Sequence, residues 1–77
     1  MVNSNIVDAW NKARIVYQLR YAKFCRRYRE NPDDKENLGH LHEASWVLIS
    51  VFGLTDKQVD EVEKNDGLTN KEIEEDF

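Results

Sequence analysis

The 77-residue chain contains a single cysteine, Cys25, so no disulfide can form within it. One cysteine and two histidines also supply too few ligands for a structural zinc site. A small protein that relies on neither device fits a reducing compartment, where cysteines stay as thiols. We therefore expect the protein to be cytoplasmic.

Long apolar runs are missing as well, and no segment of the sequence has the length and apolarity of a transmembrane helix. Asp8, Lys12 and Arg14 interrupt the N-terminal region, where a signal peptide would need an apolar stretch. The sequence thus predicts neither secretion nor an association with a membrane.

Recognisable catalytic motifs are absent too. The sequence has no glycine-rich phosphate-binding loop, no serine nucleophile elbow and no paired carboxylates in an apolar setting. His40 and His42 are two residues apart, so on a helix they point away from each other and cannot bind one metal ion. Cys25 has no histidine on its own predicted helix to act as a base. We therefore predict no catalytic residue, no cofactor and no metal, and a protein that is not an enzyme.

Helix boundaries follow from the few residues that break or cap helices. Pro32 disfavours helical backbone at the residue before it, so a first helix is predicted over residues 6–30, with Asn5 as its N-cap. Either Asp33 or Asp34 can cap a second helix over residues 34–52, and Gly53 is placed to end it in a left-handed conformation.

The C-terminal part contains a near-repeat with an offset of fourteen residues, in which Gly-Leu-Thr occurs at 53–55 and again at 67–69. In both copies the threonine is followed three residues later by Gln58 or Glu72, which is the spacing of a helix capping box. A short third helix is predicted over residues 56–64, and a weak helical turn after Thr69. We divide the chain into a helical domain, 1–66, and an acidic C-terminal tail, 67–77, that is partly ordered or frayed.

The fold class predicted from these elements is all-α, with the two long helices forming an antiparallel hairpin. Aromatic and aliphatic residues spaced three and four apart predict the core face of the first helix. These residues are Ile6, Ala9, Trp10, Ala13, Tyr17, Tyr21, Phe24 and Tyr28.

Some apolar residues fall off the main stripes of the two long helices and predict a second apolar band, made of Ile15, Leu19, Trp46, Val47 and Val51. The short third helix is too polar to cover all of it, and an exposed apolar patch usually marks an interface. We expect these five residues to contact a second copy of the chain, in a homodimer resembling a four-helix bundle, or a different partner protein.

Charge is distributed unevenly although the net charge is only -4. Residues 1–31 carry seven Lys and Arg against two acids, whereas residues 32–77 carry four Lys against thirteen acids. Either the two halves lie side by side and partly neutralise each other, or each half faces a different partner.

A basic ribbon on the first helix is compatible with two hypotheses about the function. Its residues are Lys12, Arg20, Lys23 and Arg27. The first reading is a small regulator or inhibitor of bacterial or phage type, which binds another protein through an aromatic and basic helical surface. The alternative is a nucleic-acid-associated protein whose ribbon contacts phosphates. The acidic pI of about 5.1 favours the protein partner.

Overall fold

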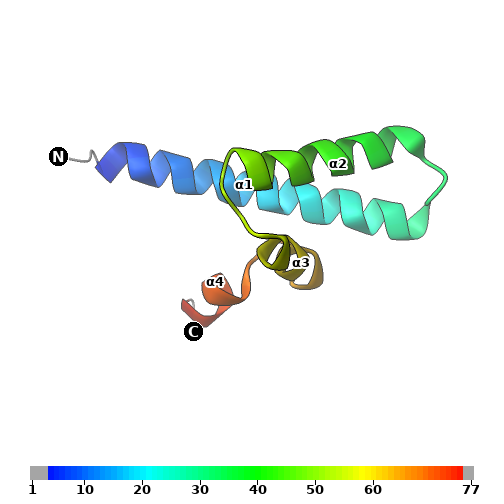
Figure 1. The fold of residues 1–77 in the computed structure, drawn as a ribbon. Coiled ribbons are helices and arrows are strands. Elements are labelled where there is room, and N and C mark those ends of the chain that lie inside the picture. The colour runs from blue at the N-terminus through cyan, green and yellow to red at the C-terminus, as the bar shows by residue number, and fades with distance from the viewer. Residues whose placement is uncertain (1–3, 76–77) are drawn as a thin grey trace.

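Four helices make up the described part of the chain in the computed structural model, which describes residues 4–75 and their side chains from residue 6 onward. They are α1 (Ser4–Glu30), α2 (Lys35–Ser50), α3 (Asp56–Lys64) and α4 (Asn70–Glu75). The first two form an antiparallel hairpin, and the two short helices lie together on one side of it (Figure 1). The predicted all-α fold with a helical hairpin is confirmed.

The connection between α1 and α2 is a tight turn after Asn31, as the proline predicts. Of the two candidate caps, Asp34 is the one used, and its carboxylate accepts a hydrogen bond from the backbone N–H of Asn37 at 3.1 Å. The predicted N-cap of the first helix, in contrast, is wrong. Because α1 already begins at Ser4, Asn5 lies within the helix and cannot be its N-cap.

Helix α2 ends at Ser50, two residues before the predicted end, and the chain then reverses at Gly53. Gly53 has a φ of 73°, in the left-handed region that glycine adopts without steric cost. The N–H of the next residue, Leu54, donates to the carbonyl of Leu48 at 3.0 Å. The predicted left-handed glycine is therefore confirmed, and it directs the chain towards α3.

Both threonines of the near-repeat begin helices, as predicted. At the start of α3, the Thr55 hydroxyl accepts from the Gln58 N–H, and the Gln58 side chain accepts from the Thr55 N–H. Before α4, Thr69 and Glu72 exchange the same pair of hydrogen bonds, at 2.9 and 3.3 Å. The two repeats therefore encode two reciprocally capped helix starts.

The core lies where α3 crosses the hairpin. It consists of Tyr21, Ala22, Cys25, Ala44, Leu48, Leu54, Val59 and Val62, all buried. The predicted core face of α1 is confirmed in its middle, where Tyr21 is buried and Tyr17 and Phe24 pack against the core. It is wrong towards both ends, where Ile6, Trp10 and Tyr28 are exposed. The packing of α3 has turned the buried side of α1 towards Ala22 and Cys25.

The molecule is elongated, with extents of 48 × 25 × 17 Å. Its radius of gyration is 13.3 Å, whereas a compact domain of this length has a value of about 11.5 Å. The length comes from the hairpin, which α3 and α4 cover on one side only (Figure 1). The opposite side of the hairpin has no covering element among the described residues.

Candidate interaction surface

Helices α1 and α2 run side by side in a register that contacts between their side chains define. The Trp10 and Phe52 rings lie 4.8 Å apart at one end of the hairpin. Nearer the turn, the Phe24 ring stacks on the His40 imidazole at 5.5 Å. Phe52 lies just beyond α2 and its ring also contacts Tyr17, so the register within the helices is given by the Phe24–His40 pair and by two cavities, one lined by Arg20 and Glu43 and the other by Arg27 and Glu36. Residues of the two helices whose numbers add up to between about 62 and 64 therefore lie roughly level with each other.

We call the uncovered side of the α1–α2 pair the open hairpin face. Its position follows from helix geometry, because Gln18 and Ala22 of α1 face α3 and α4, and residues half a turn away point to the other side. On α1 it contains Lys12, Ala13, Val16, Arg20, Lys23 and Arg27, and on α2 it contains Glu36, His40, Glu43, Val47 and Val51.

An open cavity of about 340 Å³ lies in the groove between the helices on this face. The Arg20 guanidinium lies over the Tyr17 ring, 5.6 Å from its centroid, a geometry that allows a cation–π contact. The cavity therefore combines aromatic surface with charges of both signs. It is lined by Tyr17, Arg20, Lys23, Phe24, His40, Glu43 and Ala44.

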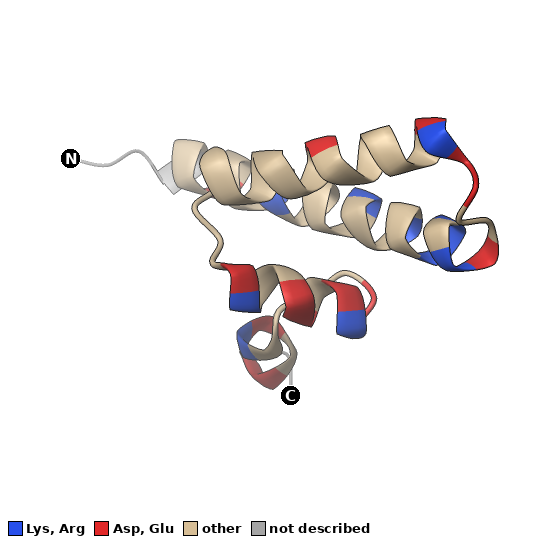
Figure 2. Cartoon of the chain, turned by 45° about the vertical axis from the view of Figure 1, so that its right-hand side comes forward, with Lys and Arg blue, Asp and Glu red and all other residues tan. Residues whose placement is uncertain are grey.

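The basic ribbon predicted from the sequence lies on the open hairpin face, and all four of its residues are exposed. Within residues 4–75, no carboxylate oxygen lies within 4.0 Å of the Lys12, Arg20, Lys23 or Arg27 cations. Figure 2 shows Lys and Arg along α1, and acidic residues gathered on α3 and α4. The ribbon thus lies away from most of the chain's own acidic residues.

The other arginines of α1 pair with the acidic half. Arg26 bridges to Asp66, and the Arg14 guanidinium lies 3.4 Å from the Glu72 carboxylate. Neutralisation between the two halves is therefore present on one side of α1, whereas separate partners for the two halves stay a prediction. One side of α1 is neutralised by the C-terminal half, and the other carries cations without a nearby acid.

The five residues predicted as one interface do not form one patch. Leu19 is two residues from Tyr17, about 200° around the helix, and points away from α2 onto the backbone of Gly67. Trp46 is likewise two residues from the buried Ala44 and points away from α1, with 62% of its surface exposed.

The remaining three of the five are also divided between two sides of the hairpin. Ile15 is half-buried on the side of α1 that faces α4. Val47 and Val51 lie on the open hairpin face, with Val47 half-buried and Val51 exposed. The sequence could not show this separation, because it depends on where α3 and α4 dock.

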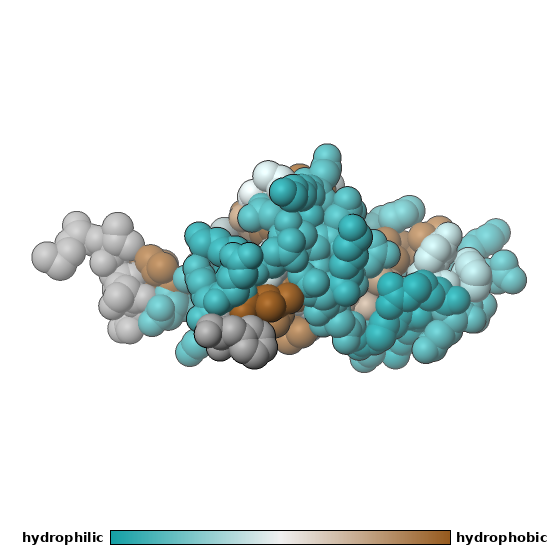
Figure 3. Space-filling model, turned by 90° about the horizontal axis from the view of Figure 1, so that it is seen from below, coloured by the Kyte–Doolittle hydropathy of each residue, from teal (hydrophilic) through white to brown (hydrophobic). Residues whose placement is uncertain are grey.

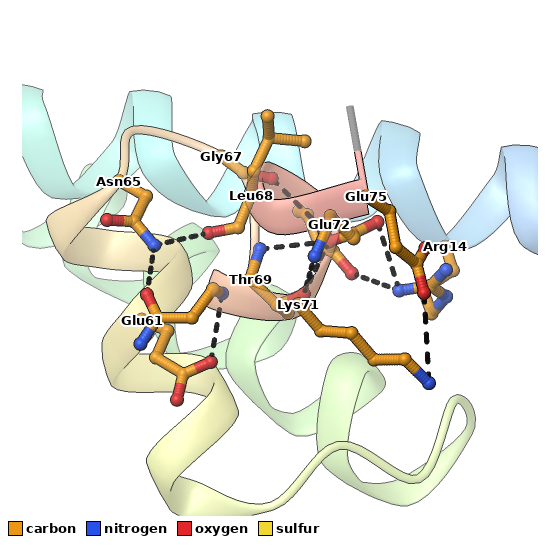
Figure 4. A network of polar contacts seen from close by, with 11 residues as sticks. Arg14, Glu61, Asn65, Gly67, Leu68, Thr69, Lys71, Glu72 and Glu75 are labelled. Atoms are coloured by element: carbon orange, nitrogen blue, oxygen red, sulfur yellow. Dashed lines mark hydrogen bonds and ion pairs between the residues drawn. The ribbon is translucent and has the colours of Figure 1, made fainter. Parts of the chain in front are cut away.

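A polar network that sequence reasoning missed attaches α4 to α1 (Figure 4). Gln18 is fully buried, and its side-chain amide donates to the Gly67 carbonyl at 3.1 Å and to the Glu72 carboxylate at 2.8 Å. Arg14 donates to the Gln18 side-chain oxygen at 2.8 Å. Every hydrogen-bonding group of the Gln18 side chain is thus engaged, as a buried amide requires.

The charge of Glu72 is stabilised by this network. Burial alone would raise its pKa, but hydrogen bonds from the Thr69 backbone and hydroxyl, from Gln18, and the charge of Arg14 outweigh the burial and lower it. A signal for the network existed in the sequence, since Glu72 is the acid of the second capping box. Its partner Gln18 carried no such signal.

The histidines and the cysteine lie in different surroundings. No group of three potential metal ligands occurs among the residues that the structure describes. His40 stacks on Phe24 and lies 3.9 Å from the Glu36 carboxylate. Burial raises the pKa of the Cys25 thiol, so the thiol stays protonated at neutral pH and is a weak nucleophile.

Within residues 4–75, no helix is both long enough and apolar enough to span a membrane. Seen from the side of α3 and α4, the surface is largely hydrophilic, with apolar side chains in small separate areas (Figure 3). This view does not include the open hairpin face.

Comparison with protein-family models finds no family that matches the chain, and no curated protein and no solved structure matches it significantly either.

Proposed function

We propose that this chain is a small, non-enzymatic protein-interaction module, a regulator or inhibitor of bacterial or phage type that acts in the cytoplasm. It binds another protein chain through the open hairpin face. The observation that carries the proposal is that uncovered aromatic, aliphatic and basic side chains meet on one face. Tyrosine and arginine are residues that often dominate binding energy at protein interfaces, and Tyr17 and Arg20 line the cavity there together.

The mixed charge of the face favours a protein over a nucleic acid. Glu43 lines the same cavity as Arg20 and Lys23, and a phosphate backbone placed there would meet this carboxylate. The net charge of -4 adds a long-range repulsion between the chain and a polyanion. A protein partner can present both signs of charge and an apolar surface at once.

A pull-down from extract of the native cell with three tagged baits tests the proposal. The baits are the wild type, Val47→Glu on the open hairpin face, and Val7→Glu as the matched control. Val7 is exposed and lies on the same side of α1 as Gln18, away from the open face. A specific partner should bind the wild type and Val7→Glu, and should be lost with Val47→Glu because the added charge would be desolvated in the interface. Binding of that purified protein to the three purified baits must show the same difference in affinity, with Val47→Glu the weakest. Equal binding to all three baits would refute the proposal.

A nucleic-acid-associated role is the second candidate, favoured by the four cations that extend along α1 without nearby acids. It predicts retention on immobilised heparin or DNA that falls steeply with salt, and less retention for Arg20→Glu than for Lys57→Glu on α3. Passage through both columns at low salt excludes it.

A further inference from the structure

We propose that the chain bound by the open hairpin face is a second copy of this protein, in a two-fold homodimer where α1 of each protomer packs on α2 of its partner. The proposal rests on the proposed function and names its partner. Three features of the face carry it: the division of its charge between the two helices, the register of the hairpin, and an apolar centre.

Apart from Glu30 at the end of α1, which lies about five turns from Lys12, the charges of the open hairpin face are separated by helix. The cations of the ribbon all lie on α1, and the acids Glu36 and Glu43 lie on α2. Glu36 has 88% of its side chain exposed and lies 3.9 Å from His40. Among the side chains described, Glu43 has no cation within 4.0 Å, although it lines the same cavity as Arg20. The face therefore offers a basic helix and an acidic helix side by side.

The register of the hairpin brings unlike charges level with each other. Since level residues have numbers that add up to between 62 and 64, Arg20 is level with Glu43, and Arg27 is level with Glu36. Val16 is level with Val47 by the same rule.

Consider a two-fold axis that runs parallel to the helices and lies on the open hairpin face. Rotation about it leaves the height of each residue along the helices unchanged and brings α1 of the partner to the side where α2 lies. It places α1 of one protomer over α2 of the other, in antiparallel orientation and at the same height. Arg20 then faces the partner's Glu43, and Arg27 faces the partner's Glu36. Because the axis is two-fold, each of these ion pairs forms twice. The four long helices make a four-helix bundle.

The other face-to-face arrangement is unfavourable. A two-fold axis that lies in the face but runs across the helices would place α1 on α1 of the partner. The basic ribbons of the two α1 helices would then run over each other, so that cations such as Arg20 and Arg27 would face cations of the partner, and like charges in contact disfavour association. The charge pattern thus selects one of the two symmetric arrangements.

The apolar centre of the face provides the area for such a bundle. Val16 and Val51 are exposed by 48% and 46%, and Val47 is half-buried between them on the face. In the dimer, Val16 meets the partner's Val47 and the two cavities merge into an enclosed centre, where Tyr17 and Phe24 gain cover. A chain of this size buries few apolar residues alone, and dimerisation is a common way for small domains to complete a core.

Complementary charge reversal tests the arrangement. Arg20→Glu and Glu43→Arg are separate variants, each of which sets two pairs of like charges against each other in its own homodimer. Mixed one to one, they form a heterodimer in which both cross-protomer pairs are of opposite charge. Pairing of Arg20 with Glu43 inside one chain cannot produce this result, because neither variant alone contains the complementary partner.

Sedimentation equilibrium over a range of concentrations measures the outcome. The wild type and the control Lys57→Glu should have twice the 9.1 kDa mass of one chain. Each single variant should show a dimer dissociation constant raised by about tenfold or more, and the mixture should return to the wild-type value. Circular dichroism verifies that each variant keeps its helices, which is expected because both positions are at the surface.

A monomeric wild type, or dimers that charge reversal leaves unchanged, would overturn the homodimer. The proposed function is judged separately. If the wild type is monomeric but the Val47→Glu bait loses a partner that Val7→Glu retains, the open face binds a different protein. If neither the mass nor the partner responds to changes on this face, both proposals fail.

Discussion

Gln18 shows how a single polar residue can fix the position of an element far away in the sequence. It is fully buried, yet it lies on the side of α1 that contacts the end of α3 and the start of α4. Its amide is the only side-chain group described that donates to the carbonyl of Gly67 and also to the carboxylate of Glu72. Removing it leaves the Gly67 carbonyl without its side-chain donor, takes one of several donors from the Glu72 carboxylate, and deprives Arg14 of an acceptor.

We expect Gln18→Ala to lower the free energy of unfolding by about 2–3 kcal/mol, because it deletes these hydrogen bonds and leaves a small cavity. Asn11→Ala is the matched control, since Asn11 is an exposed amide on the same helix. It should change the stability by less than about 0.5 kcal/mol. Urea unfolding followed by circular dichroism measures both. Equal effects of the two substitutions would mean that the network contributes nothing.

The lowered pKa of Glu72 predicts a dependence of stability on pH. A carboxylate whose pKa is lower in the folded state stabilises the fold at pH values above its ordinary pKa of 4.5, and loses this contribution as the pH falls through the folded value. Glu72→Gln should therefore be less stable than the wild type at pH 7, and the difference should shrink below about pH 4.5. Urea unfolding from pH 3 to pH 7 measures it, and a difference that stays constant with pH would contradict the assignment.

The three glycines allow backbone strain to be separated from packing. Gly53 has a φ of 73° and no atom within 4 Å of an added β-carbon, so Gly53→Ala should cost about 1 kcal/mol from the backbone alone. Gly67→Ala should cost more, because Gly67 has a φ of 126°, which also strains an alanine, and its β-carbon would in addition lie 2.6 Å from Leu19 Cδ2, which must move.

Gly39 lies inside α2 with open space around it, so Gly39→Ala should stabilise by about 0.5–1 kcal/mol. Thermal melts of the three alanine variants measure these effects, and the predicted order of stability is Gly39→Ala, then Gly53→Ala, then Gly67→Ala. A stabilising effect at Gly53 would contradict the left-handed helix end.

At the scale of elements, the two capping boxes have the same chemistry in different surroundings. Thr55 is exposed, whereas Thr69 is buried at 3% exposure and its hydroxyl contacts Glu72 within the polar network. We predict that Thr55→Ala costs about 1 kcal/mol and Thr69→Ala about 2 kcal/mol, both measured by chemical unfolding. A larger cost at Thr55 would mean that the docking of α4 adds nothing to the cap.

The ends of the helices could be predicted from the sequence because capping is local. Asp34, Gly53, Thr55 and Thr69 each act within a few residues of their own position, and all four act as the sequence suggests. The start of α1 could not be predicted in this way, because a polar residue such as Asn5 is equally compatible with a place inside the helix.

The side of α1 that is buried could not be predicted, because apolar residues occur on two sides of the helix. The stripe through Trp10 and Tyr17 is apolar enough to be a core, but the buried side is turned towards Gln18 and Ala22. The choice is made by α3, whose Val59 and Val62 enter the core from that side. The same choice separates Leu19 from Trp46 and leaves the basic ribbon on the open face.

The division into a helical domain and an acidic tail, 67–77, stays a prediction at the scale of the chain. Within the tail, α4 is attached by the contacts of Gln18 and Arg14 with Glu72. Hydrogen exchange of the α4 amides in the wild type and in Gln18→Ala would show how far these contacts order it.

For the whole molecule, the account depends on the asymmetry between the two sides of the hairpin. One side is closed by α3 and α4, with arginines and acids paired across the contact. The other side carries an open cavity, level charges of opposite sign and uncovered valines. This asymmetry is the basis of our proposal that one face serves the stability of the chain and the other serves association.

The most direct test of this claim is a series of two-dimensional ¹H–¹⁵N NMR spectra of the wild type, recorded from dilute to concentrated solution. The account predicts that amide resonances of the open face, such as those of Ala13, Arg20, Glu43 and Val47, shift or broaden with concentration, while those of α3 stay in place. Changes confined to α3 and α4, or spectra that do not depend on concentration and do not respond on the open face to a bound partner, would contradict it.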